Sequence, residues 1–206
     1  MSGTNITRLE ASERSAVIQA QTYEIELDLT TRDDTFTSKT TVHFTAREGN
    51  STWIDFIAPK VARIDLNGES LDIGTHDGFR IPLPNLKSHN VLIVEAEAAY
   101  MNTGEGMHRF IDPVDDEVYL YTQFEIADAR RVFACFDQPD IKATFAFTIT
   151  APDHWKVTSN SATPMPESVR DGIERWTFAP SAKMSTYITA IVAGPYYEVR
   201  DEYKGK

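Results

Sequence analysis

The residues best suited to chemistry are Gln123 and Glu125, which lie two positions apart in the otherwise apolar and aromatic sequence YLYTQFEI. A run of this composition predicts a β-strand, and side chains two apart on a strand point to the same face. We therefore expect these two polar side chains to converge on one spot. Phe124 and Ile126 should then lie on the opposite face. A carboxylate beside an amide is a suitable receptor for a cation with several N–H donors.

A second interpretation of this pair is an ordinary solvated strand face. The neighbouring sequence favours a built site, because the pair is surrounded by aromatic residues such as Tyr121 and Phe133 and is followed by Arg130 and Arg131. Such a density of aromatic and charged side chains is unusual for a surface that only meets water. We therefore treat Gln123 and Glu125 as candidate binding residues.

The elements that must position this pair begin directly after it. The sequence DARRVFACF predicts a short helical segment from Asp128 to Phe136, with Asp128 as its N-cap. We expect Arg130, Arg131 and Asp137 to form an internal set of ion pairs that fixes the bend. Beyond Pro139 the chain returns to a strand.

The rest of the chain shows the two-residue alternation of half-buried strands. Residues 23–29 place Tyr, Ile and Leu on one face, residues 36–46 alternate again, and Asn67-Gly68 is a strong hairpin signal. No long stretch of residues 1–100 has the helical period. Farther along, we expect residues 155–159 and 174–178 to form a strand pair and residues 196–203 to form the last strand. The sequence thus predicts an all-β fold, a twisted sandwich or saddle of many short antiparallel or mixed strands, formed by residues 1–206 as a single domain. We expect residues 1–15 to be polar and flexible, and residues 10–20 to form a helical turn or to lie along the sheet.

Composition restricts the partners and the compartment. The chain has 31 Asp and Glu against 20 Lys and Arg, a net charge of −11, which argues against nucleic acid or an anionic membrane as partner. No apolar run approaches the ~20 residues that span a bilayer, and the first fifteen residues lack the apolar segment of a secretory signal. We therefore expect a cytoplasmic protein with no membrane contact.

Neither the cysteine nor the histidines of this chain indicate a catalytic site. The single cysteine, Cys135, allows no intrachain disulfide, and its apolar surroundings favour a buried structural thiol over a nucleophile. His108 lies in a Gly- and Asp-rich stretch, where a surface or structural role is more common than catalysis. None of the five histidines has the spacing of a helical zinc-binding pair. We therefore expect no catalytic residue and no metal ligand in this chain.

The central sequence, TQFEIADARRVFACFDQPDIKATF, closely resembles the N-terminal domain of the aminopeptidase N family of zinc exopeptidases, of bacterial type. The segments GEGMHRFIDP, MSTYI and VAGPY are also similar to that family, so the resemblance covers residues 23–197. It implies that Glu125 contacts the free α-amino group of a peptide and that Gln123 lines the pocket for the first side chain. Ile126 and Ala127 depart from the pattern of many members.

The resemblance also implies a catalytic domain outside this chain. The family's zinc, its HExxH helix and its Gly-x-Met-Glu-Asn strand would belong to a catalytic domain that is absent from this chain, so the fragment alone should be inactive. The implied partners are a peptide substrate and that catalytic domain, and we expect the domain to cover apolar surface near Phe110, Phe124 and Ile126. Relatives that act as scaffolds in protein assemblies, or that hydrolyse epoxides, leave a non-catalytic interaction domain as the alternative, and a free-standing β-sandwich binding module is a third option.

Overall fold

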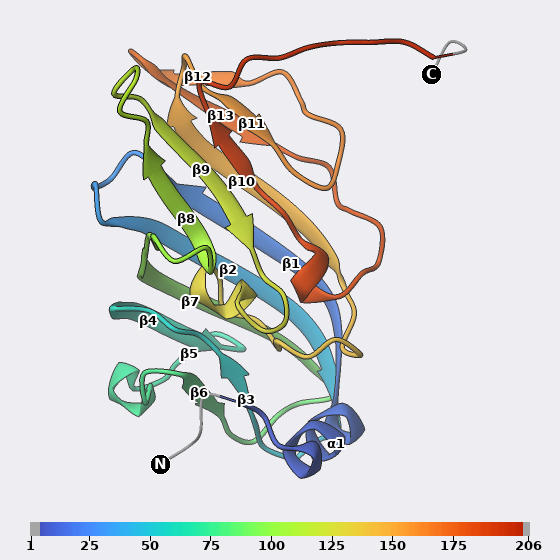
Figure 1. Ribbon diagram of the computed structural model, residues 1–206. Coiled ribbons are helices and arrows are strands. Elements are labelled where there is room, and N and C mark those ends of the chain that lie inside the picture. The colour runs from blue at the N-terminus through green and yellow to red at the C-terminus, as the bar shows by residue number, and fades with distance from the viewer. Residues whose placement is uncertain (1–4, 204–206) are drawn as a thin grey trace.

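The computed structural model describes residues 5–203, which form fourteen β-strands, one α-helix and three short 3₁₀ turns. Eight strands make one large sheet, in the order β12-β13-β10-β1-β2-β7-β4-β5 (Figure 1). Their bounds are β1 Ile18–Asp28, β2 Thr35–Ala46, β4 Lys60–Leu66, β5 Glu69–Ser70, β7 His89–Ala99, β10 Thr144–Pro152, β12 Glu167–Arg170 and β13 Ile173–Thr177. The all-β prediction is therefore confirmed.

A four-stranded antiparallel sheet forms the second layer and carries the candidate site. Its order is β11-β14-β9-β8, with β8 Gly106–Ile111, β9 Val118–Gln123, β11 Lys156–Thr158 and β14 Val192–Gly194. In Figure 1 the β8–β9 hairpin lies in front of the large sheet. A separate pair, β3 Thr52–Asp55 and β6 Arg80–Leu83, lies near the N-terminal helix. The arrangement leaves β8 at the edge of its sheet.

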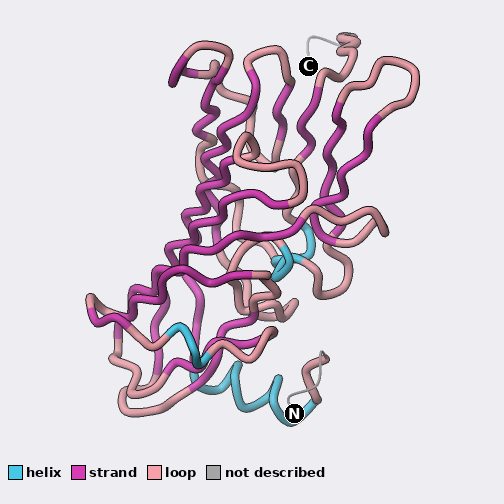
Figure 2. Tube along the Cα trace, turned by 90° about the vertical axis from the view of Figure 1, so that its left-hand side faces the viewer, coloured by secondary structure: helices cyan, strands magenta, loops and turns pink. Residues whose placement is uncertain are grey.

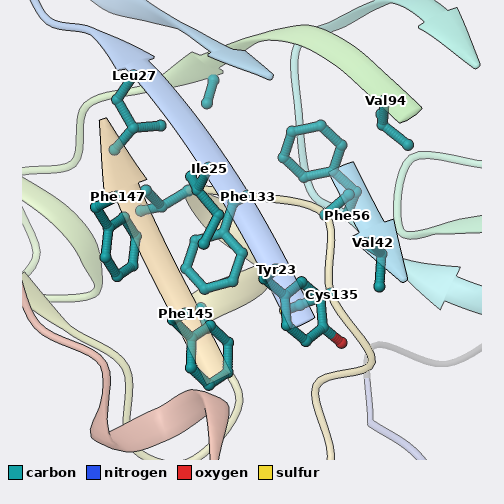
Figure 3. Packing of buried hydrophobic residues seen from close by; sticks show 14 of the residues in the cluster. Tyr23, Ile25, Leu27, Val42, Phe56, Val94, Phe133, Cys135, Phe145 and Phe147 are labelled. Carbon is teal, nitrogen blue, oxygen red and sulfur yellow. The ribbon is translucent and has the colours of Figure 1, made fainter. Parts of the chain in front are cut away.

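The core is formed where β1 and β10 run parallel in the middle of the large sheet. Tyr23 on β1 pairs in register with Phe145 on β10, and their rings stack with centroids 4.9 Å apart. Phe133, from within the central motif, contacts both rings (Figure 3). The alternation in residues 23–29 is thereby confirmed, because Tyr23, Ile25 and Leu27 are all buried.

The N-terminal segment differs from the flexible one that we expected. The α-helix α1 spans Arg8–Val17 and is closed at its start by a capping box, in which Thr7 and Glu10 exchange hydrogen bonds. Arg14 is buried and pairs with Asp55. Figures 1 and 2 show α1 at the end of the domain away from β12 and β13. Residues 1–4 of the expected flexible segment lie outside the described residues.

The central motif is less helical than predicted. Only Ala129–Arg131 form a 3₁₀ turn, η2, and the Asp128 carboxylate does not cap it but accepts a hydrogen bond from Arg131. Residues 132–138 are buried throughout, and Cys135 exchanges two backbone hydrogen bonds with Asp55. Beyond Phe133 the helix does not continue, because Cys135, Phe136 and Asp137 donate their backbone N–H groups to Asp55 and Tyr23 instead.

Two other expectations about strands were wrong. Residues 155–159 and 174–178 do not pair with each other, since β11 pairs with β14 and β13 pairs with β10 in the other sheet. Residues 196–203, expected as a last strand, contain none. The pattern that predicts a strand carries no information about its partner.

Candidate functional site

The candidate pair lies at the point where β9 ends. Gln123 is the last residue of the strand, and Glu125 follows in a turn that covers residues 125–128. Both side chains are exposed, whereas Phe124 between them is 1% exposed and packs on Phe133 with ring centroids 6.1 Å apart. The Glu125–Ile126 peptide bond is cis. Both candidate side chains are thus accessible to a ligand, and Phe124 anchors the chain between them.

The strand argument that predicted the site holds only in part. The alternation continues as far as Phe124, which lies on the face opposite Gln123, but this face is buried in the core. Ile126 was expected on the same face as Phe124 and is instead 70% exposed, because the strand has already ended and the chain forms a turn. Glu125 is therefore placed by the turn rather than by the phase of the strand.

Strand β8 supplies the neighbours of Gln123. Antiparallel register pairs Gly106 with Gln123 and His108 with Tyr121, so these residues lie side by side across the hairpin (Figure 1). The His108 and Tyr121 rings stack with centroids 4.7 Å apart, and the Gly104 backbone N–H donates to Nδ1 of His108 at 3.1 Å. His108 lies on a strand rather than in the loop that the sequence suggested.

A shallow hollow continues along the same hairpin. Its volume is about 540 Å³, and its walls are mostly aromatic: His108, Phe110, Asp112, Tyr119, Tyr121 and Tyr196. Tyr119 donates its hydroxyl to Asp115, and this hydrogen bond raises the pKa of the phenol to about 12. The outer surface of the hairpin is therefore mainly aromatic, with an acidic loop at its tip.

Arg130 and Arg131 behave differently from the ion-pair set that we expected. Arg131 pairs with Asp128 and Glu105, with Nε–Oδ1 and Nη2–Oε2 distances of 2.7 Å and 3.0 Å. Arg130 donates its backbone N–H to Asp137 at 3.1 Å, while its Nε is buried with no hydrogen-bond partner among the described residues. The bridge between Glu105 and Asp128 was missed in the sequence, where its only sign is the three-residue spacing of Asp128 and Arg131.

Behind the turn, buried titratable groups are structural. Burial raises the pKa of Asp137 to about 6, although hydrogen bonds from Thr186 and the Arg130 backbone act in the opposite direction. Burial also raises the pKa of the Cys135 thiol, with the nearby Asp137 and Asp55 carboxylates adding to the effect. Cys135 is fully buried and unpaired, as predicted for a structural thiol.

Between residues 5 and 203 no cluster of three or more His, Cys, Asp or Glu side chains is suited to holding a metal ion. Over the same residues, none of the helices is both long enough and apolar enough to cross a membrane. What the site offers is thus an exposed carboxylate and an exposed amide beside an aromatic hairpin.

Comparison with known proteins identifies the class to which this architecture belongs. The sequence profile of the Peptidase M1 N-terminal domain matches residues 19–188. The chain therefore belongs to the family of M1 peptidase N-terminal domains. Gln123, Glu125 and the whole β8–β9 hairpin lie within the matched residues.

Individual relatives give the same assignment. The chain is 50% identical over 209 residues to Aminopeptidase N of Streptomyces lividans, covering 99% of this chain and 24% of the relative. It is 34% identical over 137 residues to Aminopeptidase N of Acetobacter pasteurianus, covering 62% and 37%. It is 27% identical over 184 residues to Tricorn protease-interacting factor F2 of Thermoplasma acidophilum, covering 88% and 23%. The chain thus spans between about a quarter and about a third of these relatives.

Proposed function

We propose that this chain is the substrate-recognition domain of a zinc aminopeptidase, in which Glu125 binds the free α-amino end of a peptide and Gln123 lines the pocket for the first side chain. The observation that carries the proposal is the exposure of both side chains at the end of β9, in a domain of the M1 family. The motif TQFE, on which the resemblance rests, lies at this strand end.

The chemistry of the pair suits this role. A peptide α-amino group has a pKa of ~7.7–8.0 and is largely cationic at neutral pH. An exposed carboxylate can accept a charge-assisted hydrogen bond from that ammonium group, and a neighbouring amide oxygen can accept another. A fixed amino end also sets the position of the first peptide bond, which is what an enzyme that removes single N-terminal residues requires.

The hydrolytic step belongs to the part of the protein that this chain does not contain. The described residues do not form a set of zinc ligands, so the proposed zinc would be held by a catalytic domain that follows this one. We propose that the isolated chain neither retains stoichiometric zinc nor cleaves aminoacyl substrates. Exposed apolar side chains on β8 and in the turn after β9, Phe110 and Ile126, are candidates for contact with that domain. Phe124, which we also expected there, is buried.

A cytoplasmic location is part of the proposal. The support for it is the single cysteine, which is buried and unpaired, as is usual for proteins of reducing compartments. The proposed substrates are therefore peptides of the cytoplasm.

One relative supports a second candidate function. The Thermoplasma protein is named an interacting factor of the tricorn protease, which favours a non-catalytic scaffold or interaction domain as the alternative. The two candidates differ in what the reading frame encodes after Lys206. An HExxH motif with a downstream Glu supports the peptidase, and the lack of that motif supports the scaffold.

The test of the peptidase proposal is steady-state kinetics of the full-length protein with Glu125→Gln. A hydrogen bond to a charged group contributes ~1.5–3 kcal/mol, so kcat/KM for an aminoacyl amide should fall about ten- to a hundredfold. Zinc content and melting temperature should not change, because the substitution is nearly isosteric and the side chain is exposed. Gln123→Ala should have a milder effect and should mainly alter side-chain preference.

A matched control is Glu167→Gln, which alters an exposed glutamate on the edge strand β12 and should leave kcat/KM unchanged. If Glu125→Gln also leaves kcat/KM within about twofold of the wild type, the amino-end role is wrong and Glu125 belongs to an ordinary solvated surface.

A further inference from the structure

Three segments around the candidate site meet at one side chain, Arg131. Its Nε donates to Oδ1 of Asp128 at 2.7 Å, within the turn that follows Glu125. Its Nη2 lies 3.0 Å from Oε2 of Glu105, in the loop that precedes β8. One guanidinium therefore ties the segment that carries Glu125 to the segment that leads into the neighbouring strand.

The stem of Arg131 also lies against the start of β8. A Cβ atom placed on Gly106 would be 2.9 Å from Cβ of Arg131 and 3.1 Å from its Cδ. Gly106 has a φ of +61°, and it pairs in register with Gln123. The absence of a side chain at Gly106 thus allows Arg131 to pack directly beside the strand position that faces Gln123.

Buried residues hold both ends of the turn, since Ala129 is buried after it and the Arg130 carbonyl accepts the Ile57 N–H at 2.7 Å. Phe124 is buried, and its carbonyl accepts the Asp128 N–H at 3.1 Å, while the Asp128 carbonyl accepts the Arg131 N–H at 3.1 Å. Between these points Glu125 and Ile126 are exposed. The ion pairs of Arg131 link this exposed turn to the loop before β8, in addition to the β8–β9 ladder that ends at Gln123.

The charges are consistent with a role in placement rather than in binding. An unpaired guanidinium beside the site would repel a substrate ammonium group. Here Arg131 is paired with two carboxylates, so the group of Glu105, Asp128 and Arg131 carries a net charge of −1 and Glu125 adds another. The charge of Arg131 is thus neutralised locally by its two carboxylates.

We propose that Arg131 is a positioning residue, which through Asp128 and Glu105 fixes the turn carrying Glu125 against β8 and so sets the separation of Glu125 and Gln123. This inference rests on the proposed function as far as substrate is concerned. Its structural part, the fixing of the turn, stands independently. Because the Arg131 side chain is 26% exposed and the Glu105 side chain 51%, these ion pairs contribute little to global stability.

The test compares Arg131→Gln, Arg131→Lys and a matched control, Arg63→Gln. Arg63 also bridges two carboxylates, Asp65 and Glu95, on strands β4 and β7 away from the site. Hydrogen exchange is measured on the 206-residue chain, and kinetics on the full-length protein with an aminoacyl amide. Glu125→Gln is measured in parallel, so that the two proposals are tested separately.

In Arg131→Gln, exchange should accelerate over residues 124–131 and 105–108, and kcat/KM should fall about tenfold or more, as expected for a displaced positioning group. The loss should include kcat, because a misplaced amino end presents its peptide bond poorly. Arg131→Lys should recover part of the loss, since an ammonium keeps the charge but cannot bridge two carboxylates as a planar fork does. Arg63→Gln should change neither measurement at the site.

Three results separate the possible failures. Unchanged exchange in Arg131→Gln overturns the positioning role whatever the kinetics. Faster exchange with unchanged kcat/KM, when Glu125→Gln does lower kcat/KM, also overturns it. Faster exchange with no kinetic effect of either variant contradicts the proposed function of Glu125, but supports Arg131 as the residue that fixes the turn.

Discussion

Arg14 and Asp55 form a buried ion pair in which Nη1 of Arg14 lies 2.6 Å from Oδ2 of Asp55, with side chains 0% and 3% exposed. The same carboxylate oxygen accepts the Asp137 backbone N–H at 3.0 Å, and Nε of Arg14 donates to Gln138 at 3.1 Å. The pair thus joins α1 to strand β3 and to the buried segment behind the candidate site. An N-terminal helix with a mainly polar sequence is thereby made part of the core.

Removal of the Arg14 side chain should therefore lower the free energy of unfolding strongly. Arg14→Ala leaves Asp55 as a buried charge without its partner, and breaking such a pair destabilises proteins by about 3–5 kcal/mol. The control is Lys39→Ala, which breaks an exposed ion pair with Glu26 of the same 2.6 Å length and should cost at most about 1 kcal/mol. Denaturant unfolding measures both, and equal small losses in the two variants would contradict the structural role of Arg14.

The N-terminal helix could not be predicted from composition alone. Residues 1–15 are polar, and polarity alone predicted a flexible segment. The Thr7–Glu10 capping box was visible in the sequence as T-x-x-E, so the start of α1 was predictable. The burial of Arg14 was not, because its partner Asp55 is distant in sequence and is brought near only by the fold.

Stability should depend on pH through Asp137. Burial raises the pKa of this carboxyl to about 6 in the folded chain from 3.8, so the folded state holds the proton more tightly. The stabilisation by this proton is complete below about pH 4 and is lost as pH rises through about 6, a change on the order of 3 kcal/mol for this shift. Asp137→Asn should remove that dependence.

The measurement is the difference in unfolding free energy between Asp137→Asn and the wild type from pH 4 to pH 7. The difference should move in favour of the variant as pH rises to about 6. A comparison with the wild type is needed because Glu10 changes the pH dependence of stability in the opposite direction. Its pKa is lowered to about 2, first by the hydrogen bond from Arg80, so its stabilisation is lost as pH falls below 4.5. A difference that is constant with pH would contradict the assignment to Asp137.

Cys135 should be chemically inert in the folded chain. Its side chain is fully buried, and burial raises the pKa of the thiol, so little thiolate is present to react. A chromogenic disulfide reagent should label Cys135 of the native chain no faster than the chain unfolds around it. The chain unfolded in guanidinium chloride serves as the positive control. Rapid stoichiometric labelling of the native chain would show that Cys135 is accessible.

The fold was predictable in class and in its longest strands. Tyr23, Ile25 and Leu27 alternate so regularly that the buried face of β1 could be assigned from the sequence. Its parallel partner β10 lies more than a hundred residues away, and nothing in the alternation of either strand indicates the pairing. The short strands β11 and β13 were assigned to each other for the same reason, although they belong to different sheets.

The candidate site was predictable in residue type but not in geometry. The Q-x-E spacing located the pair, while the end of β9 at Gln123 was hidden because the apolar run continues through Phe124 and Ile126. The predicted helix after Asp128 is shortened to η2, since the N–H groups of Cys135 to Asp137 bond to Asp55 and Tyr23 rather than to the preceding turn. Arg131 was noticed as a charge near the site. Its two partners depend on how the loop before β8 meets the turn.

The central claim, that Glu125 receives the α-ammonium group of a peptide, is tested most directly by one comparison of substrates in the full-length protein. We would measure kcat/KM of the wild type and of Glu125→Gln on an aminoacyl amide and on its N-acetylated analogue. The account predicts a loss of about ten- to a hundredfold on the free amine and a change of at most about twofold on the acetylated analogue, which has no charge for Glu125 to contact. Equal losses on both substrates, or no loss on the free amine, would contradict it.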